Sequence, residues 1–342
     1  MTTVLVTGGS GFVGAHTIAR LLALGYEVRS TIRSLSRTPV VHGMLRHAGV
    51  DTSGVRLVVA DLSSDEGWTE AVRGCDKVLH VASPFPVRNP RNHDELIVPA
   101  REGTLRVLRA ARAAGVTRVV LTSSFSAVGY GHEPGKVLDE RDWTDPDIPG
   151  LSAYVRSKAM AERAAWDFVE REGGGLQLVA LNPVRIFGPV LGPDYSASTA
   201  LITRMLGGGL PVAPPGHINT VDVRDVAEAH VTAMLSEVAP GQRYLLAAGE
   251  PVSFGQIARI LRRNLGRAAR RAPAVTLPGW LLPPLGRIVP ALRAGARQGG
   301  PIQRVDTTKA RTELGWVPRS NEEAITATGE SLMRLGLLEG RR

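Results

Sequence analysis

The chain has 342 residues, of which 43% are hydrophobic, and this suits one large globular domain or one domain with a smaller lobe. Its formal net charge is +9 at pH 7, and arginines that are scattered, apart from a basic run at 259–271, supply most of it. Because no aromatic residues interleave with them to form a stacking surface, we expect no nucleic-acid partner. A weak face for polyanions is the alternative.

Two features bear on the compartment. No apolar run approaches the roughly 20 residues needed to span a bilayer, and the N-terminus does not resemble a signal peptide. Cys75 is the only cysteine, so an internal disulfide cannot form and we expect a cytoplasmic protein. The apolar, arginine-studded segment 274–300 either packs over a substrate lobe, with Trp280 in the cover, or lies on a membrane surface. We expect the first arrangement and no stable membrane insertion.

Short β-branched runs and runs with helical spacing alternate along the first half of the chain. We expect strands at 2–8, 27–33, 55–62, 77–83, 118–124 and 176–183. We expect helices between them at 11–25, 65–74, 95–115 and 153–172. This alternation predicts an α/β fold of Rossmann type, a doubly wound parallel sheet with helices on both faces.

The rhythm changes after Asn182, where prolines and glycines cluster at 183–216 and 273–301. We therefore predict a sheet domain over residues 1–182 and mainly a smaller C-terminal substrate-binding lobe over 183–342. The helical pattern at about 219–237 predicts a segment that returns to the sheet domain.

The stretch TGGSGFVG places Gly8, Gly11 and Gly14 between the first strand and the first helix. Such a loop turns tightly, brings backbone close to a pyrophosphate and lets the helix pack on the sheet, and a side chain would obstruct each of these. The helix N-terminus, at Phe12 and Val13, then offers N–H groups and a positive dipole end to the phosphates. The loop therefore predicts a dinucleotide site.

The choice of dinucleotide depends on the end of the second strand, where an NAD site usually carries an acidic residue for the ribose hydroxyls. The range 28–50 contains no carboxylate. Arg33 stands just past that strand and Arg37 follows, and a guanidinium suits a 2′-phosphate through charge and bidentate hydrogen bonding. The sequence thus favours NADPH/NADP+. Asp61 and Leu62, at the end of the third strand, are expected beside the adenine, whose amino group Asp61 can accept from.

Tyr154 and Lys158 lie four residues apart in the helix expected after the fifth strand, so their side chains share one face. A phenol has an ordinary pKa of about 10, and a nearby ammonium lowers it by favouring the phenolate. The strand-end motif TSS brings a hydroxyl of Ser124, or of Ser123, within reach. With NADPH as hydride source, Tyr154 as proton donor and Ser124 holding the carbonyl oxygen, these residues predict carbonyl reduction.

Six motifs together carry a resemblance to a known family. They are TGGSGFVG at 7–14, DL at 61–62, HVASP at 80–84, TSS at 122–124, YVRSK at 154–158 and NPVRIFGP at 182–189. The chain resembles the extended short-chain dehydrogenase/reductases and, within them, the branch of dihydroflavonol reductase, cinnamoyl-CoA reductase and yeast-type carbonyl reductase. This resemblance implies NADPH-dependent reduction of a ketone or aldehyde, with Lys158 binding the nicotinamide ribose as well as acidifying Tyr154.

The resemblance also implies further contacts. Pro183 would flank the nicotinamide, and the cofactor cleft would be lined by Val81, Ala82, Ser83 and Thr122. The expected partner is a small-molecule carbonyl substrate, no metal is assigned, and the family allows a monomer or a homodimer.

Two departures from the family pattern matter. Many extended members carry an Asn in the helix before the fifth strand, where this chain reads IVPAREGT at 97–104, so a proton relay through that Asn is not expected. Sugar-nucleotide epimerases typically show an RYxNxxGP pattern, in which Arg185 here replaces the Asn. The alternative of an NAD-dependent sugar-nucleotide epimerase or dehydratase is therefore disfavoured. So is a nucleotide-sensing regulator, because Tyr154 and Lys158 are both present.

The motifs do not name the substrate, whose pocket would draw on loops at 84–87, 125–131, 185–195 and 210–220. Arg185 stands where sugar-nucleotide relatives present a polar group to the ligand. Either its guanidinium faces the cleft and binds a carboxylate or another acceptor-rich group, or its stem packs beneath the lobe with its head in solvent.

Overall fold

The structure is a computed structural model. It describes residues 2–84, 90, 92–193, 197–278 and 302–338.

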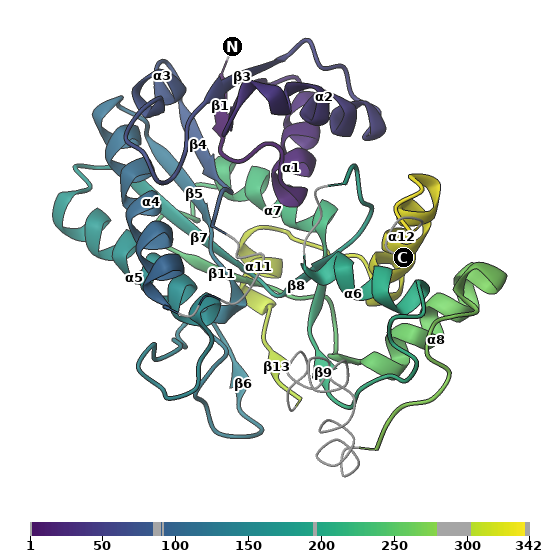
Figure 1. Cartoon of the computed structure of the whole chain (residues 1–342). Coiled ribbons are helices and arrows are strands. Elements are labelled where there is room, and N and C mark those ends of the chain that lie inside the picture. Colours follow the sequence, from purple (N-terminus) through teal and green to yellow (C-terminus); the bar gives the residue numbers. More distant parts are fainter. Residues whose placement is uncertain (1, 85–89, 91, 194–196, 279–301, 339–342) are drawn as a thin grey trace.

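A seven-stranded parallel sheet forms the centre of the molecule (Figure 1). Its strands lie in the spatial order β11, β7, β5, β4, β1, β2, β3. Their bounds are β1 Thr3–Val6, β2 Glu27–Ile32, β3 Val55–Val59, β4 Lys77–His80, β5 Arg118–Thr122, β7 Gln177–Pro183 and β11 Arg243–Leu246. The chain runs outward from β1 to β3 and then crosses to β4 on the other side of β1. The strand order therefore reverses beside β1, which is where such sheets bind ligands beyond their carboxyl ends.

Helices cover both faces of this sheet and create two apolar layers (Figure 1). On one face α1 packs against α7 and α2, and on the other α5 packs against α4, which also contacts α3. The bounds are α1 Phe12–Ala23, α2 Thr38–His47, α3 Trp68–Val72, α4 Asp94–Ala113, α5 Ala153–Glu172 and α7 Val223–Leu235. This three-layer arrangement confirms the predicted Rossmann-type fold class.

Several of the remaining elements build a smaller unit around a core of its own, which includes Phe187, Met205, Phe254 and Leu332. Its helices are α6 Ala197–Leu206, α8 Phe254–Leu265 and α12 Asn321–Arg334. Helix α11 Thr308–Glu313 contacts β11 instead, and its Ala310 belongs to the core of the central sheet. The short strand pairs outside the central sheet are β8 Arg185–Phe187 with β10 Thr220–Asp222, β9 His217–Ile218 with β12 Val252–Ser253, and β6 Val137–Leu138 with β13 Arg304–Val305. Three 3-10 turns, η1 Leu35–Arg37, η2 Phe125–Ala127 and η3 Gly266–Ala269, complete the described elements.

Three local features differ from the sequence expectation. Strand β3 ends at Val59, so Asp61 follows the strand instead of ending it. Helix α3 is shorter than expected, because only its central residues turn regularly. Helix α2 was not expected, and it forms because Val41, Met44 and Leu45 bury one helical face. The division at residue 182 stays a prediction, although α7 and β11 both join the central sheet layer from beyond it.

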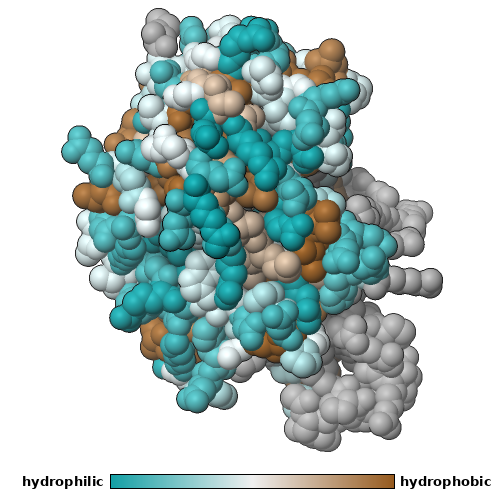
Figure 2. Space-filling model, turned by 90° about the vertical axis from the view of Figure 1, so that its left-hand side faces the viewer, coloured by the Kyte–Doolittle hydropathy of each residue, from teal (hydrophilic) through white to brown (hydrophobic). Residues whose placement is uncertain are grey.

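The face over α4 and α5 is mostly hydrophilic, with hydrophobic residues scattered over it in small groups (Figure 2). Scattered apolar residues of this kind are normal on a protein surface. Among the residues that the structure describes, no helix combines the length and the apolar character needed to cross a membrane.

Candidate active site

The glycine loop leads from β1 directly into α1 and has no room for side chains. Gly8 has a φ of 74°, and a Cβ there would meet Ala82 at 3.0 Å. A Cβ on Gly14 would lie 2.3 Å from the carbonyl oxygen of Gly8. Gly11 caps α1 without any side-chain hydrogen bond, so its first N–H groups face the loop without a side-chain cap. This bare cradle at a helix N-terminus fits a pyrophosphate.

The turn after β4 is held against the glycine loop by hydrogen bonds. The amide of Ala82 donates to the Thr7 hydroxyl at 2.9 Å, and that hydroxyl also hydrogen-bonds Nδ1 of His80 at 2.8 Å. Burial, and to a lesser degree the charge of Lys158, lower the pKa of His80 to about 3, so this ring is neutral. The half-buried turn of residues 81–83 thus lies against the cradle at Ala82, and its place in the wall of the cofactor cleft stays a prediction.

The predicted 2′-phosphate end lies where β2 and β3 finish. Arg33 is exposed and Arg37 is half-buried in η1. The hydrogen bond from the Ser63 hydroxyl and that from the Ser63 amide, at 2.8 Å, lower the pKa of Asp61, and the charge of Arg33 lowers it further. Arg33 is therefore close enough to act on Asp61, Leu62 packs against Gly103 of α4, and the role of these residues in holding an adenosine phosphate stays a prediction.

Tyr154 lies in the first turn of α5, because Ser152 caps this helix by accepting from the amide of Val155 at 3.3 Å. The side chain of Ser124, which follows β5, hydrogen-bonds the Tyr154 phenol. The Ser124 oxygen also accepts from the amide of Ser126 at 3.1 Å. Of the two serines between which the sequence left the choice open, Ser124 is the one whose side chain contacts the Tyr154 phenol. The structure therefore brings the expected proton donor and the expected carbonyl-binding hydroxyl together.

The environment of the Tyr154 phenol keeps it protonated. Burial raises its pKa, whereas the hydrogen bond from Ser124 and the positive charge of Arg185 lower it. A protonated phenol beside a hydroxyl and a cation can give its proton to an oxygen that becomes negative. The sequence analysis expected Lys158 to lower the pKa of Tyr154, but in the structure burial raises that pKa and the cation that acts against burial is Arg185.

Lys158 is buried, with 8% of its surface exposed, and its Nζ donates to the carbonyl oxygen of Thr122 at 3.3 Å. Burial lowers its pKa to about 8, and the carboxylate of Glu162 acts in the opposite direction. The Thr122 hydroxyl hydrogen-bonds Nε2 of His230 at 2.6 Å, and burial lowers the pKa of that ring to about 4. Pro183, predicted beside the nicotinamide, is buried at the end of β7.

Arg185 begins β8, where its amide donates to the carbonyl oxygen of Asn219 at 3.3 Å. Burial lowers the pKa of its guanidinium, whose charge acts on both Tyr154 and Tyr130. The Asn219 side chain in turn donates to the carbonyl oxygen of Gln303 at 2.9 Å. The guanidinium of Arg185 therefore acts electrostatically on the expected proton donor, and whether it binds the substrate stays a prediction.

The sequence analysis did not assign a role to three residues that form a buried network behind Ser124 and Lys158, namely Glu162, Asn182 and Arg243. Glu162 follows Lys158 by four residues and shares its face of α5, which is the signal that could have identified it. Arg243 lies 81 residues further along the chain, and no local pattern marks its contact with Glu162.

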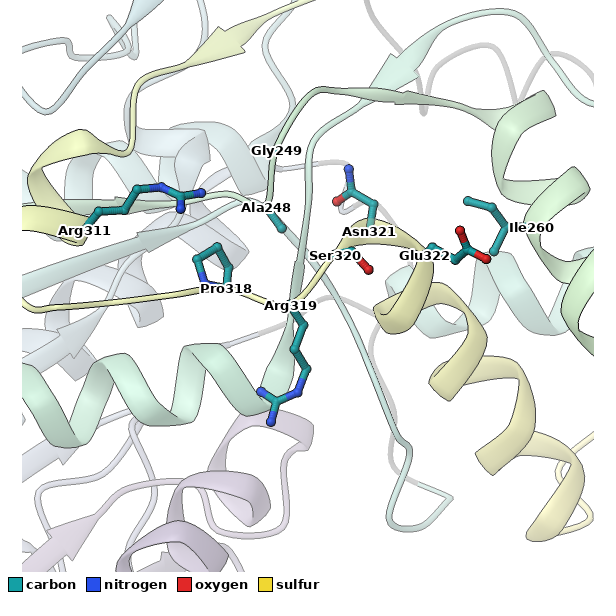
Figure 3. A pocket seen from close by; sticks show the side chains of 9 residues that line it. All are labelled: Ala248, Gly249, Ile260, Arg311, Pro318, Arg319, Ser320, Asn321 and Glu322. Atoms are coloured by element: carbon teal, nitrogen blue, oxygen red, sulfur yellow. The ribbon is translucent and has the colours of Figure 1, made fainter.

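A separate open pocket of about 500 Å³ lies near the start of α12 (Figure 3). Its lining residues are Ala248, Gly249, Ile260, Arg311, Pro318, Arg319, Ser320, Asn321 and Glu322. The Arg319 guanidinium points away from the others and pairs with Asp225. No predicted site residue lines this pocket.

Parts of the expected substrate pocket lie outside the described residues. These are 85–87 and 194–195, together with most of the segment 274–300 and its Trp280.

Comparison with known proteins gives four consistent likenesses. Residues 4–247 match the model of the NAD dependent epimerase/dehydratase family. The chain is 36% identical over 267 residues to cinnamoyl-CoA reductase CAD2 of Medicago truncatula, covering 76% of this chain and 79% of that protein. It is 32% identical to the putative NADPH-dependent methylglyoxal reductase GRP2 of Candida albicans, covering 80% and 85%. The structure of yeast methylglyoxal/isovaleraldehyde reductase Gre2 complexed with NADPH matches with a TM-score of 0.80 at 25% identity, covering 98% and 100%.

Proposed function

The chain belongs to the NAD dependent epimerase/dehydratase family, among the extended short-chain dehydrogenase/reductases, and we propose that Tyr154 is the proton donor of its reaction. The protein is an NADPH-dependent reductase that converts a ketone or an aldehyde into an alcohol. The observation that carries the proposal is the hydrogen bond between Ser124 and the Tyr154 phenol, one helical turn before the buried Lys158.

The residues divide the work of the reduction. NADPH, when bound, supplies the hydride. Ser124 donates a hydrogen bond to the substrate carbonyl oxygen and so holds the carbon in position. The Tyr154 hydroxyl gives its proton to that oxygen as it becomes an alkoxide. The cation of Lys158 stabilises the phenolate that remains and contacts the nicotinamide ribose.

The cofactor contacts follow the same division of labour. The cradle formed by Gly8, Gly11 and Gly14 holds the pyrophosphate, and Arg33 and Arg37 bind the 2′-phosphate. A guanidinium supports the latter role because it pairs bidentately with phosphate oxygens.

The position of Arg185 supports a proposal about the substrate class. Its charge lies near both the Tyr154 and Tyr130 phenols, so it flanks the place where the carbonyl must bind. A guanidinium in a partly apolar site favours an acceptor-rich neighbour. We therefore assign to this protein carbonyl substrates with a second oxygen-rich group next to the reacting carbon, such as keto acids, keto esters and dicarbonyls.

The test is an NADPH-oxidation screen over plain ketones and aldehydes and over their acceptor-rich analogues, with wild type and Arg185→Leu. We expect Arg185→Leu to raise KM for the acceptor-rich substrates and to spare the plain ones. An equal effect on both classes would restrict Arg185 to a packing role. Purified protein that carries retained NAD and turns over without added cofactor would instead indicate a sugar-nucleotide epimerase.

The setting of the enzyme completes the proposal. A chain whose only cysteine is the buried Cys75 suits a reducing cytoplasm. Its partner is a small-molecule substrate, and it works as a monomer or a homodimer.

A further inference from the structure

A buried carboxylate, Glu162, lies one helical turn beyond Lys158 on α5. Its Oε1 accepts from Nε of Arg243 at 2.6 Å, and the two side chains are 0% and 8% exposed. Its Oε2 accepts from the Asn182 amide nitrogen at 2.6 Å and from the Ser123 hydroxyl. The carboxylate thus joins α5 to β7, to β11 and to the residue after β5, which are the elements that surround the proton donor.

The surroundings support most of the ion pair, although Nη2 of Arg243 is buried without a hydrogen-bond partner among the described residues. Nη1 of Arg243 donates to the carbonyl oxygens of Glu140 at 2.7 Å and Asp142 at 2.9 Å. Its guanidinium lies over the Trp143 ring, with Cζ 3.7 Å from the ring centre. Removing two charges from water is costly, and an apolar pair of similar volume often stabilises a fold equally well. The presence of charges here therefore invites a functional explanation.

Two connections run from this network to the proposed proton donor. The first is mechanical: the Asn182 amide nitrogen that binds Glu162 also donates to the carbonyl oxygen of Ser124 at 3.2 Å. This fixes the backbone of the residue whose hydroxyl meets Tyr154. The second is electrostatic, because the Glu162 charge favours the cationic form of Lys158 against the effect of burial.

Several other charged or titratable groups surround Lys158, and their effects on its charge differ from that of Glu162. His80 from β4 and His230 from α7 have pKa values lowered by burial to about 3 and about 4, so neither titrates in the alkaline range. Arg185 from β8 acts on Tyr154, and Arg243 from β11 pairs with Glu162. Among these described neighbours, Glu162 is therefore the negative charge that supports Lys158.

Given the proposed roles of Tyr154 and Ser124, we propose that Glu162, held by Arg243, is a positioning residue that fixes the Ser124 turn and keeps Lys158 charged during proton transfer. In this proposal the buried pair of Glu162 and Arg243 supports the three residues Ser124, Tyr154 and Lys158. It acts through Ser124 and Lys158 and does not touch the substrate.

The test compares Glu162→Gln with Glu170→Gln, which removes an exposed carboxylate from the same helix. Reduction rates are measured from pH 6 to 9.5 with saturating NADPH, together with NADPH affinity and thermal unfolding. Removing a negative charge lowers the pKa of every nearby acid, so the alkaline fall in kcat should move down by about one pH unit in Glu162→Gln. We expect a loss of kcat that approaches tenfold at pH 8.5, the limit for a shift of about one pH unit, a smaller loss at pH 6, and wild-type behaviour in Glu170→Gln.

Glu162→Asp provides the rescue, since it keeps the charge and should return the alkaline limb toward its wild-type position. A pH profile of Glu162→Gln with the wild-type shape, only scaled down, would overturn the electrostatic role. If this variant does not fold, Glu162→Gln/Arg243→Met removes both buried charges and is read in the same way. Tyr154→Phe is measured alongside: an active Tyr154→Phe refutes the proposed function, whereas an inactive one with a wild-type-like Glu162→Gln refutes only this inference.

Discussion

The proposed cofactor end and the proposed proton-transfer end of the site differ in how they are built. At the cofactor end the proposed contacts come mainly from the backbone, because the glycines leave a cradle without side chains. The cation just past β2, Arg33, is exposed. At the proton-transfer end the proposed contacts come from side chains, and Lys158, Glu162 and Arg243 are all buried.

The contrast has an energetic meaning. An exposed guanidinium acts through solvent and contributes little to folding, so its loss should change cofactor affinity and leave the fold intact. Buried charges act through a medium of lower dielectric, where each interaction is stronger and each unpaired group more costly. Changes at the two ends should therefore separate binding from chemistry.

The strongest test of this separation is Tyr154→Phe, which removes the proposed acid at the buried end. We expect turnover to fall by at least the roughly 10²-fold typical of a lost general acid, with NADPH affinity nearly unchanged. Steady-state kinetics and fluorescence titration with NADPH measure the two quantities. A Phe variant with near wild-type turnover would show that the proton comes from another group.

A second test acts on the backbone of the cofactor end. In Gly14→Ala the new methyl group would lie 2.3 Å from the Gly8 carbonyl oxygen, so the loop must shift. Overpacking of this kind costs about 1–3 kcal/mol, and we expect it to appear as weaker NADPH binding and a lower Tm. Gly43→Ala is the matched control, because a Cβ there would meet nothing within 4 Å. Equal behaviour of the two variants would contradict the bare-cradle interpretation.

The pH dependence of the reduction rate tests the buried, proton-transfer end of the site without any mutation. Burial lowers the pKa of Lys158 from 10.5 to about 8, so its cation is lost as pH rises through about 8. We expect the rate of reduction to fall above that pH, by up to about tenfold per unit. Between about pH 8 and 10.5 the unfolded chain binds the extra proton, so the Lys158 contribution to stability rises with pH. A falling rate with an undiminished Tm would therefore be chemistry, whereas a parallel fall in Tm would mean unfolding.

The smallest expected effect is at the exposed cation. We expect the wild type to prefer NADPH over NADH at least tenfold, which is about 1.4 kcal/mol, and Arg33→Ala to erode that preference while kcat with NADPH stays close to wild type. Arg46→Ala, which removes an exposed arginine from α2, is the control. Equal efficiency of the two cofactors with the native protein would contradict the role of Arg33.

The same contrast explains what could be predicted from sequence. The cradle and the Tyr154–Lys158 pair are local patterns, and α5 was predicted over 153–172 from its helical run alone, to which the structure adds the Ser152 cap. Helix α2 was missed because Pro39 and Gly43 are typical of turns, yet Pro39 stands in the first turn of the helix, where proline is tolerated, and the buried face offsets the cost of Gly43. The contact of Glu162 with Arg243 joins residues 81 positions apart, and only the assembled sheet brings them together.

The place of β11 in the sheet has a consequence for how the protein is made. When a ribosome has delivered α5 and β7, Glu162 still lacks its arginine, because Arg243 belongs to the strand that joins β7 last. Until then the Glu162 carboxylate has no counter-charge. Burying it alone would be costly, so it should stay hydrated and the elements around it should stay loosely packed. Synthesis of β11 therefore closes the catalytic half of the enzyme, and a nascent chain stalled before Arg243 should stay sensitive to proteases around α5.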